Sequence, residues 1–193
     1  LALTINAQSA SLIAGWDFQT TTTGGTAAAA SPSAPNLYQA NFGTGAIYLN
    51  GSNGSSTWIT ASSGNEVTAY TGTTNNAAAG FSTTTSGSAA LGLLGGTSQS
   101  ANGKKMAFTF SMANRKDLLV SYSIQKTTTG FSTNAWEYST NGTNWTAIDV
   151  VTNIPTSFGT TTLSNITALD GITNAFLRVT FTGSTSSSGN NRL

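Results

Sequence analysis

The side chains that could carry out acid–base or covalent chemistry are few and scattered along this 193-residue chain. It contains neither histidine nor cysteine, so general acid–base catalysis would fall mainly to its six carboxylates. These are far apart in the sequence and share no motif: Asp17, Glu66, Asp117, Glu137, Asp149 and Asp170. A glycosidase needs two carboxylates facing each other across a cleft, and only Glu137 has a suitable setting, between two aromatic residues. The ordinary place for such a residue is a solvated strand face, so we predict no enzyme and no catalytic residue.

Metal and cofactor sites are not signalled either. The chain has no zinc-binding and no phosphate-loop motif. An isolated Asp17 or Asp170 could join backbone carbonyls around a divalent cation, but an isolated aspartate more commonly forms a turn or a hydrogen bond. We therefore predict no metal site and no cofactor.

The charges argue against two classes of partner and favour a third. Seven basic residues are scattered along the chain, whereas nucleic-acid binding requires grouped cations. No apolar run reaches the roughly 20 residues of a membrane span. Only 7% of the residues are charged and the formal net charge is +1, so copies of the chain repel one another weakly. We expect a homopolymer, a protein whose partners are copies of itself.

Four aromatic side chains suggest an alternative partner, a surface polysaccharide, since sugars stack on flat exposed rings. The candidate glycan-binding residues are Trp58, Trp136, Tyr138 and Trp145. They alternate with small polar residues, a pattern that the core of a sandwich also requires. Burial in the core is therefore the competing interpretation of the same four rings.

Alternating apolar and polar residues predict strands with one buried face. The alternation is clearest in residues 11–19, 105–113, 117–125 and 175–182. Asn-Gly dipeptides at 50–51, 53–54 and 141–142 accept the positive φ of tight hairpins. The chain is thus predicted to be all-β, a single-domain antiparallel β-sandwich of jelly-roll-like form. Its expected core residues are Trp16, Phe18, Phe108, Phe110, Val120, Tyr122, Leu177, Val179 and Phe181.

Two regions fall outside this clear pattern. Residues 61–103 are a low-complexity stretch of Thr, Ser, Gly and Ala. Because a structureless loop of that length is uncommon inside a domain, we expect one or two weakly signalled strands or a short helical turn there. Residues 1–10 form an N-terminal extension ahead of the sandwich at 11–193, and their small residues also suit the tail of a signal peptide.

Three short motifs resemble a known group of proteins. They are Ala14-Gly15-Trp16-Asp17-Phe18, the run from Trp136 to Trp145, and the ending from Arg178 through Asn190-Asn191-Arg192-Leu193. The chain resembles secreted bacterial jelly-roll surface-protein domains of the PEP-CTERM-associated kind, although the Pro-Glu-Pro sorting tail of those proteins is absent. The resemblance implies a jelly roll, an extracellular location at the cell surface and no defined catalysis.

The first seven residues have the pattern of an additional strand. Leu1, Leu3, Ile5 and Ala7 alternate with Ala2, Thr4 and Asn6. The sequence also ends where a last strand begins, so we expect one sheet edge without a partner. We predict an extracellular structural protein, the subunit of a self-assembling filament or layer, in which residues 1–7 serve as a donor strand or pair within their own subunit. The alternative is a secreted carbohydrate-binding or adhesive β-sandwich module.

Overall fold

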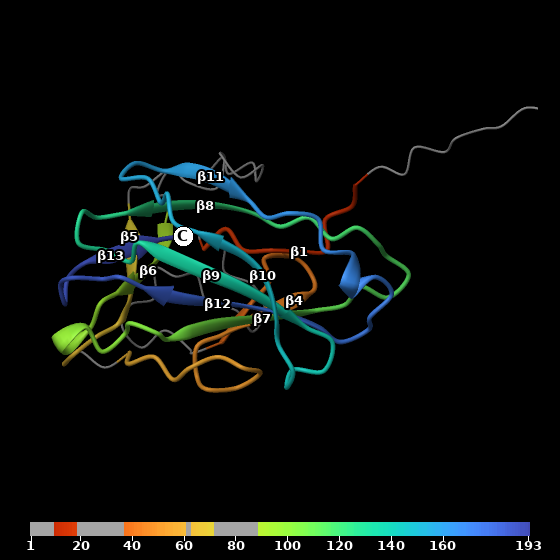
Figure 1. Cartoon of the computed structure of the whole chain (residues 1–193), viewed down its shortest axis with the longest axis horizontal. Helices are drawn as coiled ribbons and strands as arrows, with labels where there is room; N and C mark the ends of the chain where they lie inside the picture. Colours follow the sequence, from red (N-terminus) through yellow and green to blue (C-terminus); the bar gives the residue numbers. More distant parts are fainter. Residues whose placement is uncertain (1–9, 19–36, 61–62, 72–88) are drawn as a thin grey trace, which may run out of the picture.

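Two antiparallel β-sheets pack face to face in the computed structural model, which describes residues 10–18, 37–60, 63–71 and 89–193 (Figure 1). The first sheet has six strands in the order β10-β9-β12-β7-β4-β2, and the second has five in the order β11-β8-β13-β6-β5. This arrangement confirms the predicted all-β sandwich. In the described part of the chain, no helix is long and apolar enough to cross a membrane.

The six-stranded sheet contains two of the four segments with the clearest alternation, 105–113 and 175–182. Its strands are β10 (Thr146–Val151), β9 (Thr133–Ser139), β12 (Ala175–Thr182), β7 (Lys105–Phe110), β4 (Gly45–Tyr48) and β2 (Leu37–Gln39). Along β12, Leu177, Val179 and Phe181 are buried and the residues between them are partly exposed, as the alternation predicted. The β9–β10 hairpin turns at Gly142, which has a φ of 72°, and the carboxamide oxygen of Asn141 accepts the N–H groups of Thr143 and Asn144.

The five-stranded sheet draws two strands from the low-complexity stretch. Its members are β11 (Gly159–Thr162), β8 (Ser121–Lys126), β13 (Asn190–Arg192), β6 (Ala89–Leu94) and β5 (Val67–Thr71). Leu91 and Leu93 of β6 are fully buried, and Gly92 between them leaves room for the ring of Tyr70. A 3₁₀ turn, η2 (Thr97–Gln99), follows. Residues 61–103 therefore contain both the weak strands and the helical turn expected there.

One expectation about the start of the sandwich is wrong. The strand predicted at 11–19 is reduced to β1 (Ala14–Gly15), which pairs only with β3 (Phe42–Gly43) among the described residues. Beyond it, Phe18 takes a φ of 53°, which ends an extended conformation. The last strand, β13, lies inside its sheet, between β6 and β8.

Aromatic rings fill one half of the sandwich, the half around Trp58, which we call the closed half. Trp58 packs edge-on against Phe131 and Phe181, with ring centroids 6.4 Å and 5.9 Å apart. Its indole N–H donates to the carbonyl oxygen of Lys105, 2.9 Å away, so burial leaves no unpaired donor.

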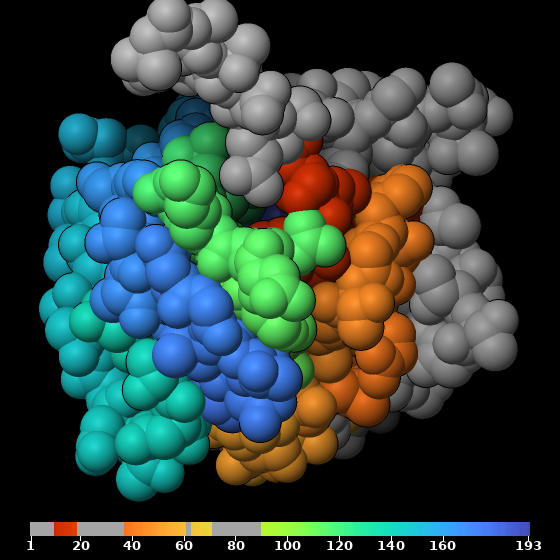
Figure 2. Space-filling view, turned by 90° about the vertical axis from the view of Figure 1, so that its right-hand side faces the viewer, coloured from red at the N-terminus to blue at the C-terminus, as the bar shows by residue number. Residues whose placement is uncertain are grey.

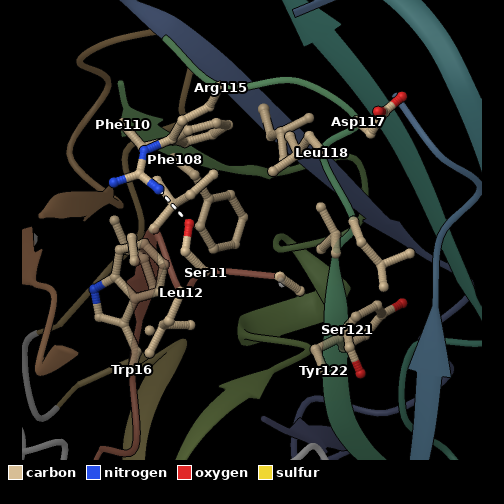
Figure 3. A pocket seen from close by; sticks show the side chains of 18 of the residues that line it. Ser11, Leu12, Trp16, Phe108, Phe110, Arg115, Asp117, Leu118, Ser121 and Tyr122 are labelled. Atoms are coloured by element: carbon tan, nitrogen blue, oxygen red, sulfur yellow. Dashed lines mark hydrogen bonds between the residues drawn. The ribbon is translucent and has the colours of Figure 1, made fainter. Parts of the chain in front are cut away.

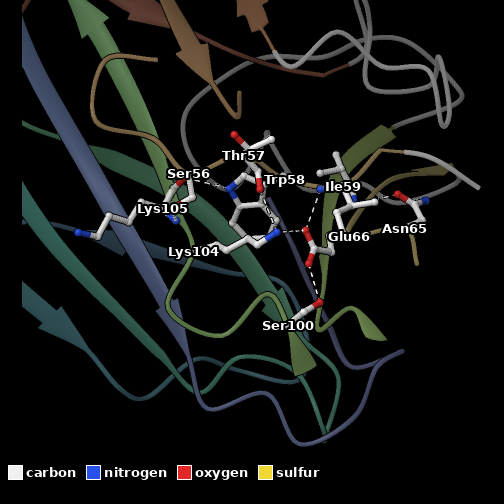
Figure 4. Close-up of polar contacts among 10 residues, drawn as sticks. Ser56, Thr57, Trp58, Ile59, Asn65, Glu66, Ser100, Lys104 and Lys105 are labelled. Atoms are coloured by element: carbon white, nitrogen blue, oxygen red, sulfur yellow. Dashed lines mark hydrogen bonds and ion pairs between the residues drawn. The ribbon is translucent and has the colours of Figure 1, made fainter. Parts of the chain in front are cut away.

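An ion pair between Lys104 and the buried carboxylate of Glu66 lies at the margin of this closed half (Figure 4). The Glu66 carboxylate is fully buried and lies 2.5 Å from the Lys104 ammonium. It also accepts hydrogen bonds from the N–H of Ile59 and the hydroxyl of Ser100, each at 2.8 Å. Lys104 donates in turn to the carbonyl of Thr57. This one carboxylate thereby joins the loop at 57–59, the start of β5 and the turn before β7.

We predict that Glu66→Gln lowers the free energy of unfolding by about 3 kcal/mol, because it leaves the Lys104 ammonium without its counter-charge in a buried position. The matched control is Glu137→Gln, which removes a more exposed ion pair with Arg178 and is expected to cost about 1 kcal/mol or less. Urea unfolding at pH 7 measures both. Equal losses for the two variants would contradict the account of Glu66.

Candidate functional site

An open cleft of about 960 Å³ separates the two sheets at the end where the chain passes from β7 to β8. Figure 2 shows this end of the molecule, where the opening lies between the red residues at 10–18 and the green residues that follow β7. Residues 10–16 form one wall, and residues 117–123 form the opposite wall. A cleft of this size between two sheets is a candidate place for a partner to bind.

Aromatic rings of the six-stranded sheet and its neighbours form the floor of the cleft (Figure 3). Phe108 stacks on Trp136 with centroids 5.6 Å apart, and Trp16 meets Phe108 edge-on at 5.7 Å. The Trp136 indole N–H donates to the Tyr122 hydroxyl at 3.2 Å. Burial raises the pKa of Tyr122, so its hydroxyl remains protonated at neutral pH. The floor is therefore apolar and uncharged.

The rim carries polar contacts and two exposed leucines. At the mouth, the Arg115 guanidinium donates a hydrogen bond to the Ser11 hydroxyl and so ties the loop after β7 to the opposite wall. Leu12 on one wall is 53% exposed and Leu119 on the other is 64% exposed. Large apolar side chains that face each other across an opening are a mark of a docking surface.

One wall of the cleft presents a strand edge. The N–H of Leu163 donates to the carbonyl of Val120, and pairing with β11 then continues from Ser121 to Ile124. In an antiparallel ladder, successive residues direct their N–H and C=O groups to opposite edges. The main-chain N–H and C=O groups of the even-numbered residues of β8 are therefore directed toward β11. Those of Ser121 and Ser123 are directed toward the cleft.

Strand β13 fills only the first part of this edge. It pairs with β8 at Lys126 and Gln125, and its last described contact is the reciprocal hydrogen-bonded pair of Leu193 and Leu91, at 2.9 Å and 3.0 Å. Among the described residues, no strand pairs with the same edge between Ser121 and Ile124. The Ser123 hydroxyl is buried and has no hydrogen-bond partner among the described residues. In the described part of the chain, this edge of β8 therefore has no strand partner at Ser121 and Ser123.

The four predicted glycan-binding rings do not share a surface. Trp58 is in the closed core, Trp136 lies in the floor of the cleft, and Tyr138 is half-buried against the same core. Only Trp145 lies on the outer face of the six-stranded sheet, where the Arg178 guanidinium sits 4.1 Å from its ring centroid. One face of the Trp145 ring is thus already occupied.

The polar residues show no catalytic arrangement. Glu137 pairs with Arg178 at 2.6 Å, and this hydrogen-bonded partner lowers the pKa of its carboxyl. Among the described residues, no three His, Cys, Asp or Glu side chains gather where they could hold a metal ion. The described side chains that line the cleft are mainly aromatic and aliphatic, with charged residues at its rim.

The predicted assembly strand lies outside the described residues, so Leu1, Leu3, Ile5 and Ala7 have no assigned position. The cleft itself was not predicted. The alternation at 117–125 correctly places Leu118, Tyr122 and Ile124 toward the interior, but it carries no information about which strand is a neighbour on the other edge.

Comparison with known proteins assigns the chain to no family. No family model matches the chain, and a search of curated proteins finds no match. Among solved structures, the chain is similar to the K2 cleaved adhesin domain of Lys-gingipain, with a TM-score of 0.41 and 10% sequence identity. The aligned region covers 92% of this chain and 97% of that one.

The two adjacent leucines of the cleft wall provide a test of its geometry. We predict that Leu118→Ala costs about 2–3 kcal/mol of unfolding free energy, because Leu118 is buried in the core. Leu119→Ala should change it by about 0.5 kcal/mol or less, because that side chain lies in solvent at the rim. Denaturant unfolding of both variants measures the difference. A larger loss for Leu119→Ala would show that the wall is placed incorrectly.

Proposed function

We propose that this chain is an adhesive β-sandwich module of the cell surface, which holds its partner by taking an extended apolar peptide segment into the cleft as an additional strand. The observation that carries this proposal is the edge of β8 at Ser121 and Ser123, which faces an apolar cleft and pairs with no described strand. Strand addition to such an edge gives affinity through main-chain hydrogen bonds and specificity through alternate side chains.

The chemistry of the cleft favours a peptide over a small polar ligand. A strand inserted beside β8 would satisfy the N–H and C=O groups of Ser121 and Ser123 and bring alternate side chains against Phe108 and Trp136. The charged groups near the opening, Arg115 and Asp117, belong to the rim. Asp117 is engaged there, since its carboxylate accepts from Asn165 and its N–H donates to Asp170.

Composition supports a place outside the cell. The chain relies on Thr, Ser, Gly and Asn for its polar surface and has only 7% charged residues. Its resemblance to bacterial jelly-roll surface proteins supports the same location. On this proposal, the module acts by adhesion and needs no catalytic group.

The test is binding of a fluorescent heptapeptide of alternating leucine and threonine, followed by anisotropy. We expect saturable binding to the native chain and at least tenfold weaker binding to Ser121→Pro, which removes an N–H that faces the cleft and leaves the ladder to β11 intact. Ser121→Ala keeps that N–H and should bind as the native chain does. Absence of binding, or equal binding to all three proteins, would refute the proposed function.

A further inference from the structure

We propose that Asn53 is a site of spontaneous chemical modification, where the asparagine is converted to aspartate and isoaspartate without an enzyme. This deamidation begins when the backbone nitrogen of the next residue attacks the side-chain carboxamide. It is fastest when the next residue is glycine, because glycine has no side chain to hinder the attack. Asn53 and Gly54 do not line the cleft, so this inference is independent of the proposed function.

The chain provides an internal comparison, because it contains four Asn-Gly dipeptides and the structure describes all of them. They are Asn50-Gly51, Asn53-Gly54, Asn102-Gly103 and Asn141-Gly142. All four asparagines are exposed, so access to water does not distinguish them. They differ in whether the two reacting groups, the glycine N–H and the asparagine carboxamide, are held by hydrogen bonds. A group that is held must be released before it can react.

Both reacting groups are held at Asn102, in the turn before β7. The Gly103 N–H donates to the carbonyl oxygen of Phe181 at 2.8 Å. The Asn102 carboxamide donates to the carbonyl of Ser184 and accepts the N–H of the same residue, each at 2.9 Å. These contacts fix the dipeptide against the end of β12.

Both groups are also held at Asn141, in the β9–β10 hairpin. The Gly142 N–H donates to the Ser139 hydroxyl at 2.9 Å. The carboxamide oxygen of Asn141 accepts the N–H groups of Thr143 and Asn144, each at 2.9 Å. Attack on this carboxamide therefore requires several hydrogen bonds of the hairpin turn to break.

Asn50 is held in a similar way in the loop after β4. The Gly51 N–H donates to the Ser55 hydroxyl, and the carboxamide oxygen of Asn50 accepts the N–H of Ser52, both at 3.0 Å. Asn50 also forms an isolated antiparallel bridge with Thr57. Its backbone and side chain are thus both restrained.

Asn53 and Gly54 are the central residues of a two-residue turn, with φ values of 53° and 83°. The Ser55 N–H closes this turn by donating to the carbonyl of Ser52 at 3.0 Å. A turn of this kind joins only its flanking residues, and its central N–H groups are not part of the hydrogen bond. Among the described residues, neither the Gly54 N–H nor the Asn53 carboxamide has a hydrogen-bond partner.

The reaction balances with water as its only co-reactant. The Gly54 nitrogen loses its proton to base and forms a bond to Cγ of Asn53. The C–N bond of the carboxamide breaks, which releases ammonia and leaves a five-membered succinimide ring. Water then opens the ring at one of its two carbonyls, which gives either aspartate or isoaspartate. Each product carries a new carboxylate, which cancels the formal net charge of +1.

The test is incubation of the folded full-length chain at pH 8, followed by proteolysis and mass spectrometry that counts aspartate and isoaspartate at each Asn-Gly dipeptide. We expect the products to accumulate at Asn53 at least fivefold faster than at the other three sites, whose hydrogen bonds must open first. In guanidinium chloride, which removes this protection, the four rates should agree within about twofold.

Two variants serve as matched controls. Ser55→Ala removes the acceptor of the Gly51 N–H but keeps the N–H that closes the turn, so the rate should rise at least twofold at Asn50 and stay the same at Asn53. Asn53→Gln keeps a carboxamide, but its additional methylene group prevents the five-membered ring, so no carboxylate should form there. Gly54 is left unchanged, because a Cβ at that position would lie 2.3 Å from Cζ2 of Trp145.

Three outcomes would overturn the inference. Another Asn-Gly dipeptide of the folded chain that reacts as fast as Asn53 would show that the hydrogen bonds do not select the site. An Asn53 that reacts in guanidinium chloride but not in the folded chain would show that the turn protects it. An unchanged rate at Asn50 in Ser55→Ala would show that the Gly51 hydrogen bond gives no protection.

Discussion

The structure of the open end of the molecule, where the cleft lies, depends on how the two edges of β8 are paired. One edge is paired along its length by β11, whereas among the described residues the other edge is paired only at Gln125 and Lys126, by β13. A strand interior to a sheet must satisfy its N–H and C=O groups on both sides, and exposed groups of this kind recruit another strand. The part of this edge at Ser121 and Ser123, which pairs with no described strand, therefore borders the cleft.

The closed half of the sandwich supplies the stability that the open half lacks. There, Trp58, Phe131 and Phe181 pack edge to face, and the buried Glu66 carboxylate bridges three segments. At the open end, the aromatic rings of Phe108 and Trp136 still stack, but the strand that would cover them is absent from the described residues. Binding at this end can thus add strand pairing without disturbing the core.

Local sequence patterns predicted the elements whose two faces differ in polarity. Leu177, Val179 and Phe181 are buried as expected, since period-two alternation reports directly on one buried face. The length of the first strand was overestimated. Leu12 shares the apolar pattern but is exposed at the rim of the cleft. The positive φ of Phe18 ends the extended segment. The pattern at 11–19 is thus made of cleft-wall residues as well as core residues.

The candidate site could not be read from the sequence, because it is set by which strands are neighbours. The alternation around Tyr122 indicates its buried face, but not that the edge at Ser121 and Ser123 pairs with no described strand. Likewise, the sequence around Glu66 does not predict its ion pair, because Lys104 is 38 residues away. Long-range pairing determines both features.

The central claim is that the edge of β8 at Ser121 and Ser123 is free in the monomer and becomes paired on binding. Amide hydrogen exchange measures this most directly, residue by residue. In the monomer, the account predicts fast exchange at Ser121 and Ser123 and slow exchange at Tyr122 and Ile124, which face β11. In the bound or assembled state, all four amides should exchange slowly. Equal protection of all four amides already in the monomer would contradict the account.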